Sequence, residues 1–212
     1  MRLKLPLIYP ITDKRLARKS SHLAILKELR RGGASFFQIR DKYTPVRELL
    51  RDLEKCRQYA EAYNMTLILN DRCDLALTAG LAGAHLGQED LPPVAARGIL
   101  GEKSIIGYST HNLAQVRESR NLPVDYIGFG PVYITDTKTN AGSAAGLKKL
   151  KSACRAATSP VVAIGGIGFE EIRPVLEAGA ASAAVISAIM TAENIAKQTE
   201  LFLETVKEYQ TL

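Results

Sequence analysis

The 212-residue sequence predicts a single-domain (β/α)8 barrel, the TIM barrel, that occupies residues 1–212. Eight short, almost wholly apolar runs alternate with longer amphipathic segments, which is typical of parallel strands covered by helices. No linker or low-complexity stretch interrupts this alternation. The alternative fold, an open doubly wound sheet, usually carries a glycine fingerprint after its first strand. Here Thr12, Asp13 and Lys14 follow that strand, which favours the barrel.

The predicted strands are short and rich in apolar residues, as expected where both faces of a strand are buried. Three of them follow a helix that is expected to end at a glycine, because glycine readily adopts the positive φ of a helix stop. These glycines are Gly33, Gly80 and Gly179. The strands cover Pro6–Ile11, Ser35–Ile39, Thr66–Leu69, Gly83–Leu86, Ile105–Gly107, Tyr126–Phe129, Val161–Ile164 and Ala183–Ile186.

Two of the intervening helices have recognisable ends. The first is expected to begin near Ser20 or Ser21 and to stop at Gly32-Gly33. In the segment after Pro45, apolar residues recur every three or four positions, which predicts an amphipathic helix. We expect Thr44 to cap this helix and Pro45 to be its first residue, where the missing N–H costs nothing.

Composition narrows the function classes. The net charge of +6 suits anionic metabolites, but the basic residues form no clustered stripe and Trp is absent, so no nucleic-acid partner is expected. No apolar run approaches the roughly 20 residues that cross a bilayer, so no membrane partner is expected. Three scattered cysteines indicate a reducing compartment, by default the cytoplasm, without disulfides or structural zinc. The oligomeric state stays open, and a homo-oligomer is compatible with the sequence.

The residues that leave each strand are the candidates for chemistry, because the active sites of such barrels lie where strands end. After the second strand, alternation should point Gln38, Arg40 and Lys42 towards the barrel mouth. Two cations at this spacing can hold a diphosphate. The alternative is a solvated loop with a surface ion pair.

Carboxylates follow the third and fourth strands. Asp71 comes directly after Asn70, and Asp90 or Glu89 supplies a second carboxylate after the next strand. Magnesium usually takes one or two carboxylates together with phosphate oxygens of the substrate. The alternative is that Asn70 or Asp71 caps the next helix. His85, within the fourth strand, is a weaker candidate because a lone histidine there is more often a core residue.

Hydroxyl groups and one ammonium group follow the next two strands. Ser109, with Thr110 and His111, is expected after the fifth strand. Its hydroxyl would donate a hydrogen bond to phosphate or, alternatively, cap the following helix. After the sixth strand, Thr135, Thr137 and Lys138 open a polar segment that runs to Gly146. This segment can close over phosphates and exclude water, or it is a plain surface loop.

The strongest local pattern lies at the last two strands. Gly166 follows the seventh strand, and Ile186 and Ser187 follow the eighth. Barrels of this kind often bind a phosphate at this position, at the N-terminus of a short helix. Backbone N–H groups exposed by glycine can approach an anion closely there. One mouth is therefore predicted to hold a Mg²⁺-bound diphosphate and a monophosphate.

At these residues the sequence resembles the thiamine phosphate synthase family, also called thiamine-phosphate pyrophosphorylase. The resemblance runs from Tyr9 to the last helix, and several motifs in the same order make it specific. The motifs are Gln38-Ile39-Arg40-Asp41-Lys42, Asn70-Asp71-Arg72, His85-Leu86-Gly87-Gln88-Glu89-Asp90, Ser109-Thr110-His111, Gly130-Pro131-Val132-Tyr133, Thr135-Asp136-Thr137-Lys138, Ala163-Ile164-Gly165-Gly166-Ile167 and Val185-Ile186-Ser187-Ala188-Ile189.

The resemblance implies a transferase that forms a C–N bond. Its substrates would be 4-amino-2-methyl-5-hydroxymethylpyrimidine diphosphate and a thiazole monophosphate, and its products thiamine phosphate and pyrophosphate. The reaction it implies is dissociative: the diphosphate leaves first, and the thiazole nitrogen captures the pyrimidine methylene cation. Mg²⁺ and cationic side chains would stabilise the leaving group.

The resemblance also assigns roles to individual residues. Asp71 and Asp90 would hold Mg²⁺. Gln38 would contact the pyrimidine, and Tyr9 and His85 would line the pyrimidine pocket. The diphosphate would be bound by Arg40, Lys42, Asn70, Ser109 and Lys138, of which all but Asn70 are the catalytic candidates. The thiazole phosphate would be bound by Thr135, Thr137, Gly166, Ile186 and Ser187.

Three departures from the family pattern remove no proposed ligand. Ile134 and Ala145 stand where proline is frequent, and Ala82 replaces a common aspartate. The nearest rival is a thiazole tautomerase, which shares the barrel, needs no magnesium diphosphate site and would use His111 as a proton shuttle. The synthase is favoured because the sequence keeps all five charged residues of the diphosphate site: Arg40, Lys42, Asp71, Asp90 and Lys138. A non-catalytic phosphate-binding barrel is the rival from another class.

Overall fold

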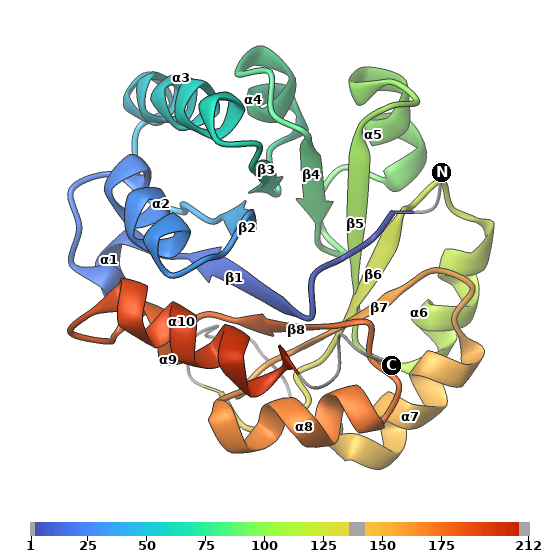
Figure 1. Ribbon diagram of the computed structural model, residues 1–212. Helices are drawn as coiled ribbons and strands as arrows, with labels where there is room; N and C mark the ends of the chain where they lie inside the picture. The colour runs from blue at the N-terminus through green and yellow to red at the C-terminus, as the bar shows by residue number, and fades with distance from the viewer. Residues whose placement is uncertain (1–2, 136–142, 208–212) are drawn as a thin grey trace.

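A computed structural model describes residues 3–135 and 143–207. Eight parallel strands close into a barrel in the order β1 to β8, with helices around the outside (Figure 1). This confirms the predicted fold, and every predicted strand is present. The strands are β1 (Ile8–Thr12), β2 (Phe36–Ile39), β3 (Thr66–Asn70), β4 (Gly83–Leu86), β5 (Ile105–Thr110), β6 (Tyr126–Phe129), β7 (Val161–Ile164) and β8 (Ser182–Val185).

The described residues form ten α-helices and one 3₁₀ turn. Two short helices, α1 and α9, lie beyond the eight that the alternation predicts, after the first and last strands. The helices are α1 (Lys14–Ala17), α2 (His22–Arg31), α3 (Val46–Ala62), α4 (Cys73–Thr78), α5 (Pro93–Leu100), α6 (Leu113–Glu118), α7 (Gly146–Ala156), α8 (Phe169–Glu177), α9 (Ser187–Met190) and α10 (Ile195–Thr205), with η1 at Ser119–Asn121.

Strand β5 is longer than the sequence indicates. Its pairing with β6 continues through Ser109, opposite Gly128, and Thr110, opposite Phe129. The expectation that Ser109 follows the strand is therefore wrong: it lies inside the strand. Polar residues at this end of β5 keep the ladder because their backbone groups still pair with β6, whatever their side chains contact.

The helix ends are mostly as predicted. Helix α2 has Ser21 as its N-cap, and Gly33, Gly80 and Gly179 all have positive φ. The expected cap of α3 is wrong, because Thr44 donates its hydroxyl to Asp41 instead, and the helix begins one residue later than expected, at Val46.

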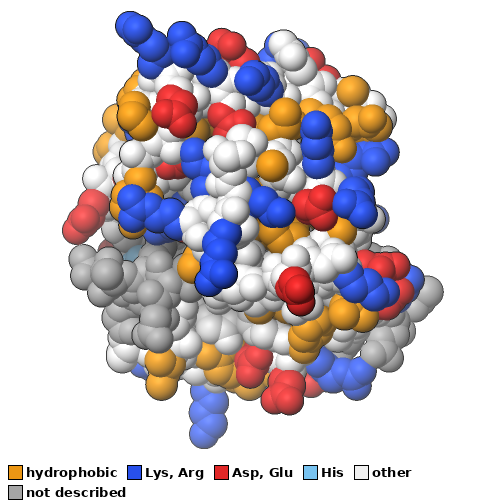
Figure 2. All heavy atoms as spheres, turned by 90° about the vertical axis from the view of Figure 1, so that its left-hand side faces the viewer, with side chains coloured by type: hydrophobic (Ala, Val, Ile, Leu, Met, Phe, Trp, Pro, Cys, Tyr) orange, Lys and Arg blue, Asp and Glu red, His pale blue; other side chains and the backbone are white. Residues whose placement is uncertain are grey.

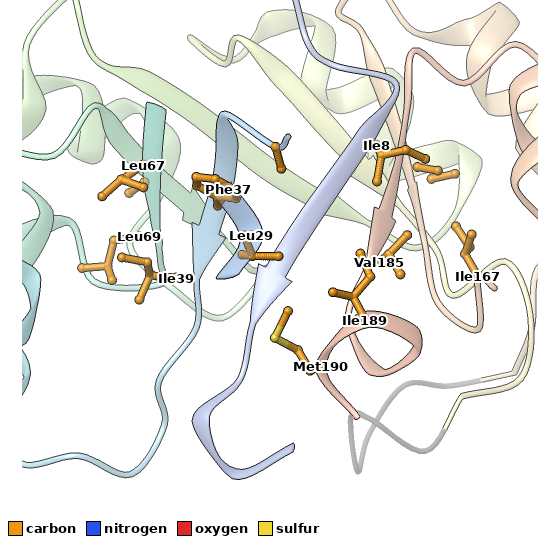
Figure 3. Packing of buried hydrophobic residues seen from close by; sticks show 14 of the residues in the cluster. Ile8, Leu29, Phe37, Ile39, Leu67, Leu69, Ile167, Val185, Ile189 and Met190 are labelled. Carbon is orange, nitrogen blue, oxygen red and sulfur yellow. The ribbon is translucent and has the colours of Figure 1, made fainter. Parts of the chain in front are cut away.

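Two apolar layers hold the barrel. A small inner cluster of Tyr9, Ile11, Phe36, Ile68, Tyr126, Val162 and Ala184 fills the barrel, with Leu3 and Leu5 of the N-terminal segment packed against it. A larger outer layer lies between strands and helices, and Figure 3 shows part of it, including Phe37 and Ile39 of β2 beside Leu67 and Leu69 of β3. Burial of this apolar surface is the main source of stability. The polar candidate residues lie at the carboxyl ends of the strands, outside these two apolar clusters.

Candidate active site

Arg40 leaves β2 with its guanidinium group in a defined position. Its Nη1 donates to Asp13 Oδ2 at 2.9 Å, and the side chain is only 10% exposed. Asp13 is fixed in turn, because its other carboxylate oxygen accepts from the backbone N–H groups of Arg15 and Leu16 and so caps α1. Arg40 Nε is buried and has no hydrogen-bond partner within the described part of the chain. Arg40 therefore retains a donor for an anion.

Asp41 holds the loop between Arg40 and Lys42. Its carboxylate accepts from the backbone N–H groups of Tyr43 and Thr44 at 2.9 Å, and from His22 Nε2 at 3.0 Å. It also lies 3.2 Å from Lys14 Nζ. Burial alone would raise the pKa of Asp41, but these hydrogen bonds outweigh burial and lower the pKa well below its ordinary value. Asp41 is thus a structural anion between two candidate ligands.

Lys42 and two carboxylates meet at the next strands. Lys42 Nζ pairs with Asp71 Oδ2, and the Asp90 carboxyl lies close enough to Asp71 to affect its pKa. Burial raises the pKa of Asp71, Lys42 opposes this shift, and the nearby Asp90 carboxylate adds to it. Asp90 Oδ2 also accepts from Gly87 N at 2.6 Å, which fixes its loop. Neither Asn70 nor Asp71 caps α4, so that alternative is excluded.

This pair of carboxylates suits a magnesium ion better than a metal held by protein ligands alone. Asp71 has a φ of +65°, a left-handed conformation that Asp tolerates better than most residues and that often marks a functional position. Residues 3–135 and 143–207 contain no cluster of three or more His, Cys, Asp or Glu that could hold a metal. Magnesium commonly uses one or two carboxylates and completes its shell with water and phosphate. The donor set fits that pattern.

A basic pocket flanks Arg40 and Lys42. It has a volume of about 420 Å³ and lies between the loops that follow β1 and β2. Its lining includes Lys14, Arg15, Arg18 and Lys19, and Arg15 lies over the ring of Tyr43 at 3.2 Å. Figure 2 shows Lys and Arg side chains spread over this side of the molecule. The local field therefore favours anions near the β2 end.

A polar line crosses the barrel interior beneath the mouth. Gln38 Nε2 donates to Tyr9 OH at 3.4 Å, and Tyr9 OH lies 2.9 Å from Tyr126 OH. His85 contacts Tyr126 OH through Nδ1 at 3.0 Å and Ser109 Oγ through Nε2 at 2.9 Å. Ser109 does not cap α6, because Asn112 does. Gln38 and Ser109, from different sides of the barrel, are thus joined through buried groups.

The β7 and β8 ends expose backbone instead of charge. Gly166 has a φ of +65°, and a Cβ there would lie 2.4 Å from the Ile134 carbonyl oxygen. The chain that follows β6 is held at the end of β7, because Val132 N and Tyr133 N donate to the carbonyls of Ile164 and Gly165. Ile186 is half-buried, and exposed Ser187 opens α9. The first N–H groups of a helix lack intrahelical partners and can meet an anion.

Two of the candidate residues lie outside the part of the chain that the structure describes. These are Thr137 and Lys138, and the roles expected for them stay predictions. Thr135 is the last described residue before that gap, and Asn70 ends β3 beside His85.

Sequence reasoning missed Asp13, His22 and Tyr126. Asp13 could have been found, since an Asp directly before a short helical turn is a common N-cap. Tyr126 carried no such pattern: it reads as a core aromatic, and its role depends on residues far away in the sequence. The same holds for His22, which lies between Thr12 and Asp41 at 2.8 and 3.0 Å.

None of the described helices is both long and apolar enough to cross a membrane.

Comparisons with known proteins show the family of this chain. A family model described as thiamine monophosphate synthase matches residues 8–189. Thiamine-phosphate synthase 1 of Aquifex aeolicus is 36% identical over 95% of this chain and 93% of its own length. Thiamine-phosphate synthase of Koribacter versatilis is 40% identical over 89% of this chain and 90% of its own length.

A solved structure of similar sequence has the same fold. Thiamine phosphate pyrophosphorylase from Pyrococcus furiosus superposes with a TM-score of 0.86 at 37% identity, covering 95% of both chains. A native KDPGal structure, at 16% identity and a TM-score of 0.74, shares the fold only. The chain therefore belongs to the thiamine monophosphate synthase family and is a transferase of thiamine biosynthesis.

Proposed function

We propose that this protein couples hydroxymethylpyrimidine diphosphate with thiazole phosphate to give thiamine phosphate and pyrophosphate, and that it needs Mg²⁺ to do so. Two observations carry the proposal: the meeting of Lys42, Asp71 and Asp90, and the buried Nε of Arg40, which has no hydrogen-bond partner among the described residues. Two carboxylates next to two cations can hold a metal and the diphosphate bound to it. A surface ion pair alone would not need a second carboxylate or a buried, unpaired donor.

On the diphosphate side, Asp71 and Asp90 would hold Mg²⁺, and Arg40 and Lys42 would bind the diphosphate oxygens. Mg²⁺, when bound, supplies positive charge that stabilises the leaving pyrophosphate. Ser109 would donate its hydroxyl to the same group. Asn70, which ends β3 next to Asp71, and Lys138 are expected to add donors.

On the nucleophile side, Gly166, Ile186 and Ser187 would receive the phosphate of the thiazole, together with Thr135 and Thr137. The exposed turn at Gly166 and the first N–H groups of α9 support this assignment. A phosphate held there would place the attached ring between the two sides of the mouth. Alignment of two reactants in this way can supply much of the rate enhancement.

The reaction would proceed by loss of the leaving group first. The C–O bond between the pyrimidine methylene and the diphosphate breaks, and its electron pair leaves with pyrophosphate. The thiazole nitrogen then donates its lone pair to the methylene carbon and forms the new C–N bond. Gln38 would orient the pyrimidine from below. No proton transfer is required in either step, which agrees with a site rich in charge and poor in general bases.

The test is turnover by purified protein with both substrates, with and without Mg²⁺. We expect equal amounts of thiamine phosphate and pyrophosphate with the metal, and at least a hundredfold slower reaction with a chelator. Isomerisation of a thiazole phosphate tautomer without any pyrophosphate would instead indicate the tautomerase alternative. Binding of both ligands without either reaction would contradict both enzymatic proposals.

A further inference from the structure

The hydrogen-bonded line under the mouth is continuous across the barrel. It begins at Gln38 of β2 and passes through Tyr9 of β1, Tyr126 of β6 and His85 of β4 to Ser109 of β5. Tyr9 and Tyr126 are 1% and 0% exposed, so water does not compete for their hydroxyl groups. Both ends of the line are residues to which the proposed function gives a substrate contact.

We propose that Tyr9, Tyr126 and His85 are positioning residues that couple the hydrogen-bonding state of Gln38 to that of Ser109. The inference rests on the proposed function, in which Gln38 contacts the pyrimidine and Ser109 contacts the diphosphate. It adds that the two contacts are not independent. A change in donor direction at one end must be answered at the other.

The coupling follows from the number of protons available. Each hydroxyl group has one proton, and a neutral imidazole has one N–H. Burial raises the pKa of Tyr9 and Tyr126 far above neutrality, so both remain protonated. With a neutral imidazole at His85, each contact in the line has one donor and one acceptor, so the donors must all point the same way.

In the first direction, Gln38 donates to Tyr9, Tyr9 to Tyr126, and Tyr126 to His85 Nδ1. His85 then donates from Nε2 to Ser109, whose own hydroxyl proton is left for a ligand. In the second direction Ser109 donates to His85, every link reverses, and the Gln38 amide turns so that its oxygen accepts from Tyr9. Amide orientation is fixed by such networks.

Mixed directions are unfavourable because two buried groups would face each other with two donors or with none. A buried polar group without its partner destabilises the folded protein. At 2.9 Å, the Tyr9 and Tyr126 oxygens cannot both withhold or both supply a proton without this cost. The line therefore switches as a unit or not at all.

The substrates select the first direction. A diphosphate oxygen only accepts hydrogen bonds, so Ser109 must donate to it. The Gln38 carbonyl oxygen is then free to accept from the exocyclic amino group of an aminopyrimidine. Binding of the leaving group would in this way set the acceptor that recognises the ring, and the enzyme would favour ligands that carry both groups.

The surrounding backbone makes room for the line. Tyr126 lies opposite Gly107 in the β5–β6 ladder. A Cβ at Gly107 would lie 2.2 Å from Tyr126 Cζ and 2.4 Å from His85 Nδ1. Only glycine allows the tyrosine and the histidine to meet at this position, so the contact is part of how the barrel is built.

The first experiment reads the imidazole tautomer of His85 by ¹⁵N NMR, with Mg²⁺ and inorganic pyrophosphate as the probe. The chain has three histidines, and His85→Gln assigns the signal. We expect the neutral tautomer with the proton on Nε2. A proton on Nδ1, or on both nitrogens, in the pyrophosphate complex overturns the proposal. This readout needs no turnover, so it stands even if the proposed reaction fails.

The second experiment is a double-mutant cycle between Gln38→Ala and Ser109→Ala, measured as kcat/KM. We expect the double variant to be about tenfold more active than independent losses predict, because either change alone already releases the line. On a Tyr126→Phe background, which keeps the ring, the two losses should multiply to within about twofold. Equal coupling on both backgrounds, or none in the wild type, refutes the link.

Two controls accompany the cycle. Tyr59→Phe, on the outer helix α3, removes a hydroxyl away from the line and should leave kcat/KM and the coupling unchanged. Circular dichroism checks that Tyr126→Phe folds. If it does not, His85→Phe breaks the same line between Tyr126 and Ser109, and the same loss of coupling is expected.

Discussion

The two sides of the barrel mouth offer an anion different groups. At the ends of β2, β3 and β4 these groups are charged side chains, and Lys42 already pairs with Asp71. At the ends of β7 and β8 they are backbone N–H groups around Gly166 and Ser187. A side-chain site can be deleted one group at a time and is screened by salt. A backbone site survives most substitutions and is lost mainly when bulk is added.

The largest effect on the charged side of the mouth is expected at Asp71. Asp71→Ala should lower the rate of pyrophosphate release about 10³-fold, because it removes one of the two carboxylates proposed for Mg²⁺. The thermal unfolding midpoint should fall modestly, because alanine tolerates the φ of +65° less well than aspartate does. Stopped assays with both substrates measure the effect. Asp74→Ala, three residues away and exposed, is the matched control.

Near-normal turnover of Asp71→Ala would remove Asp71 from the metal site. An equal loss in Asp74→Ala would mean that the effect comes from the loss of local negative charge and not from the loss of a metal ligand. Either result would contradict the view that individual side chains make up the anion site on the charged side of the mouth.

The charged side also depends on Asp41 for its shape. Asp41→Asn should lower the free energy of unfolding by about 2 kcal/mol at neutral pH, because a buried charged acceptor is lost. The pKa of Asp41 is lowered in the folded state, so its stabilisation is complete above the unfolded-state pKa near 4 and is lost as pH falls below it. Urea unfolding between pH 7 and pH 3 measures the difference between variant and wild type.

This difference should shrink below about pH 4. A gap that stays constant down to pH 3 would show that the Asp41 charge contributes nothing beyond its hydrogen-bonding shape.

The backbone side is tested by adding one methyl group. Gly166→Ala places a Cβ 2.4 Å from the Ile134 carbonyl oxygen and 2.8 Å from Tyr133 Cβ, at a φ that alanine rarely adopts. We expect KM for thiazole phosphate to rise about tenfold while KM for the pyrimidine diphosphate stays within about twofold. Gly98→Ala, where an added Cβ meets no atom within 4 Å, is the control and should change neither constant.

Equal effects of Gly166→Ala on both substrates would mean that the two sides of the mouth are not separate sites.

Much of the fold and part of the site follow from local patterns. The eight apolar runs, the glycine stops and the charged residues beyond β2, β3 and β4 are all visible along the chain, because burial and helix termination act over a few residues. Thr44 shows the limit: its hydroxyl met a better partner in Asp41 than the helix end, so a local cap rule failed.

By itself, the sequence determined the barrel, the order of its strands and the charged residues that follow β2, β3 and β4. Only the tertiary structure decided which polar groups meet inside it. Tyr9 and Tyr126 are 117 residues apart, and their contact depends on strand register and barrel closure, which no local pattern encodes. The pairing of Arg40 with Asp13 and the passage from Gln38 to Ser109 arise in the same way. Periodicity records where a side chain is buried, but not which distant group it faces.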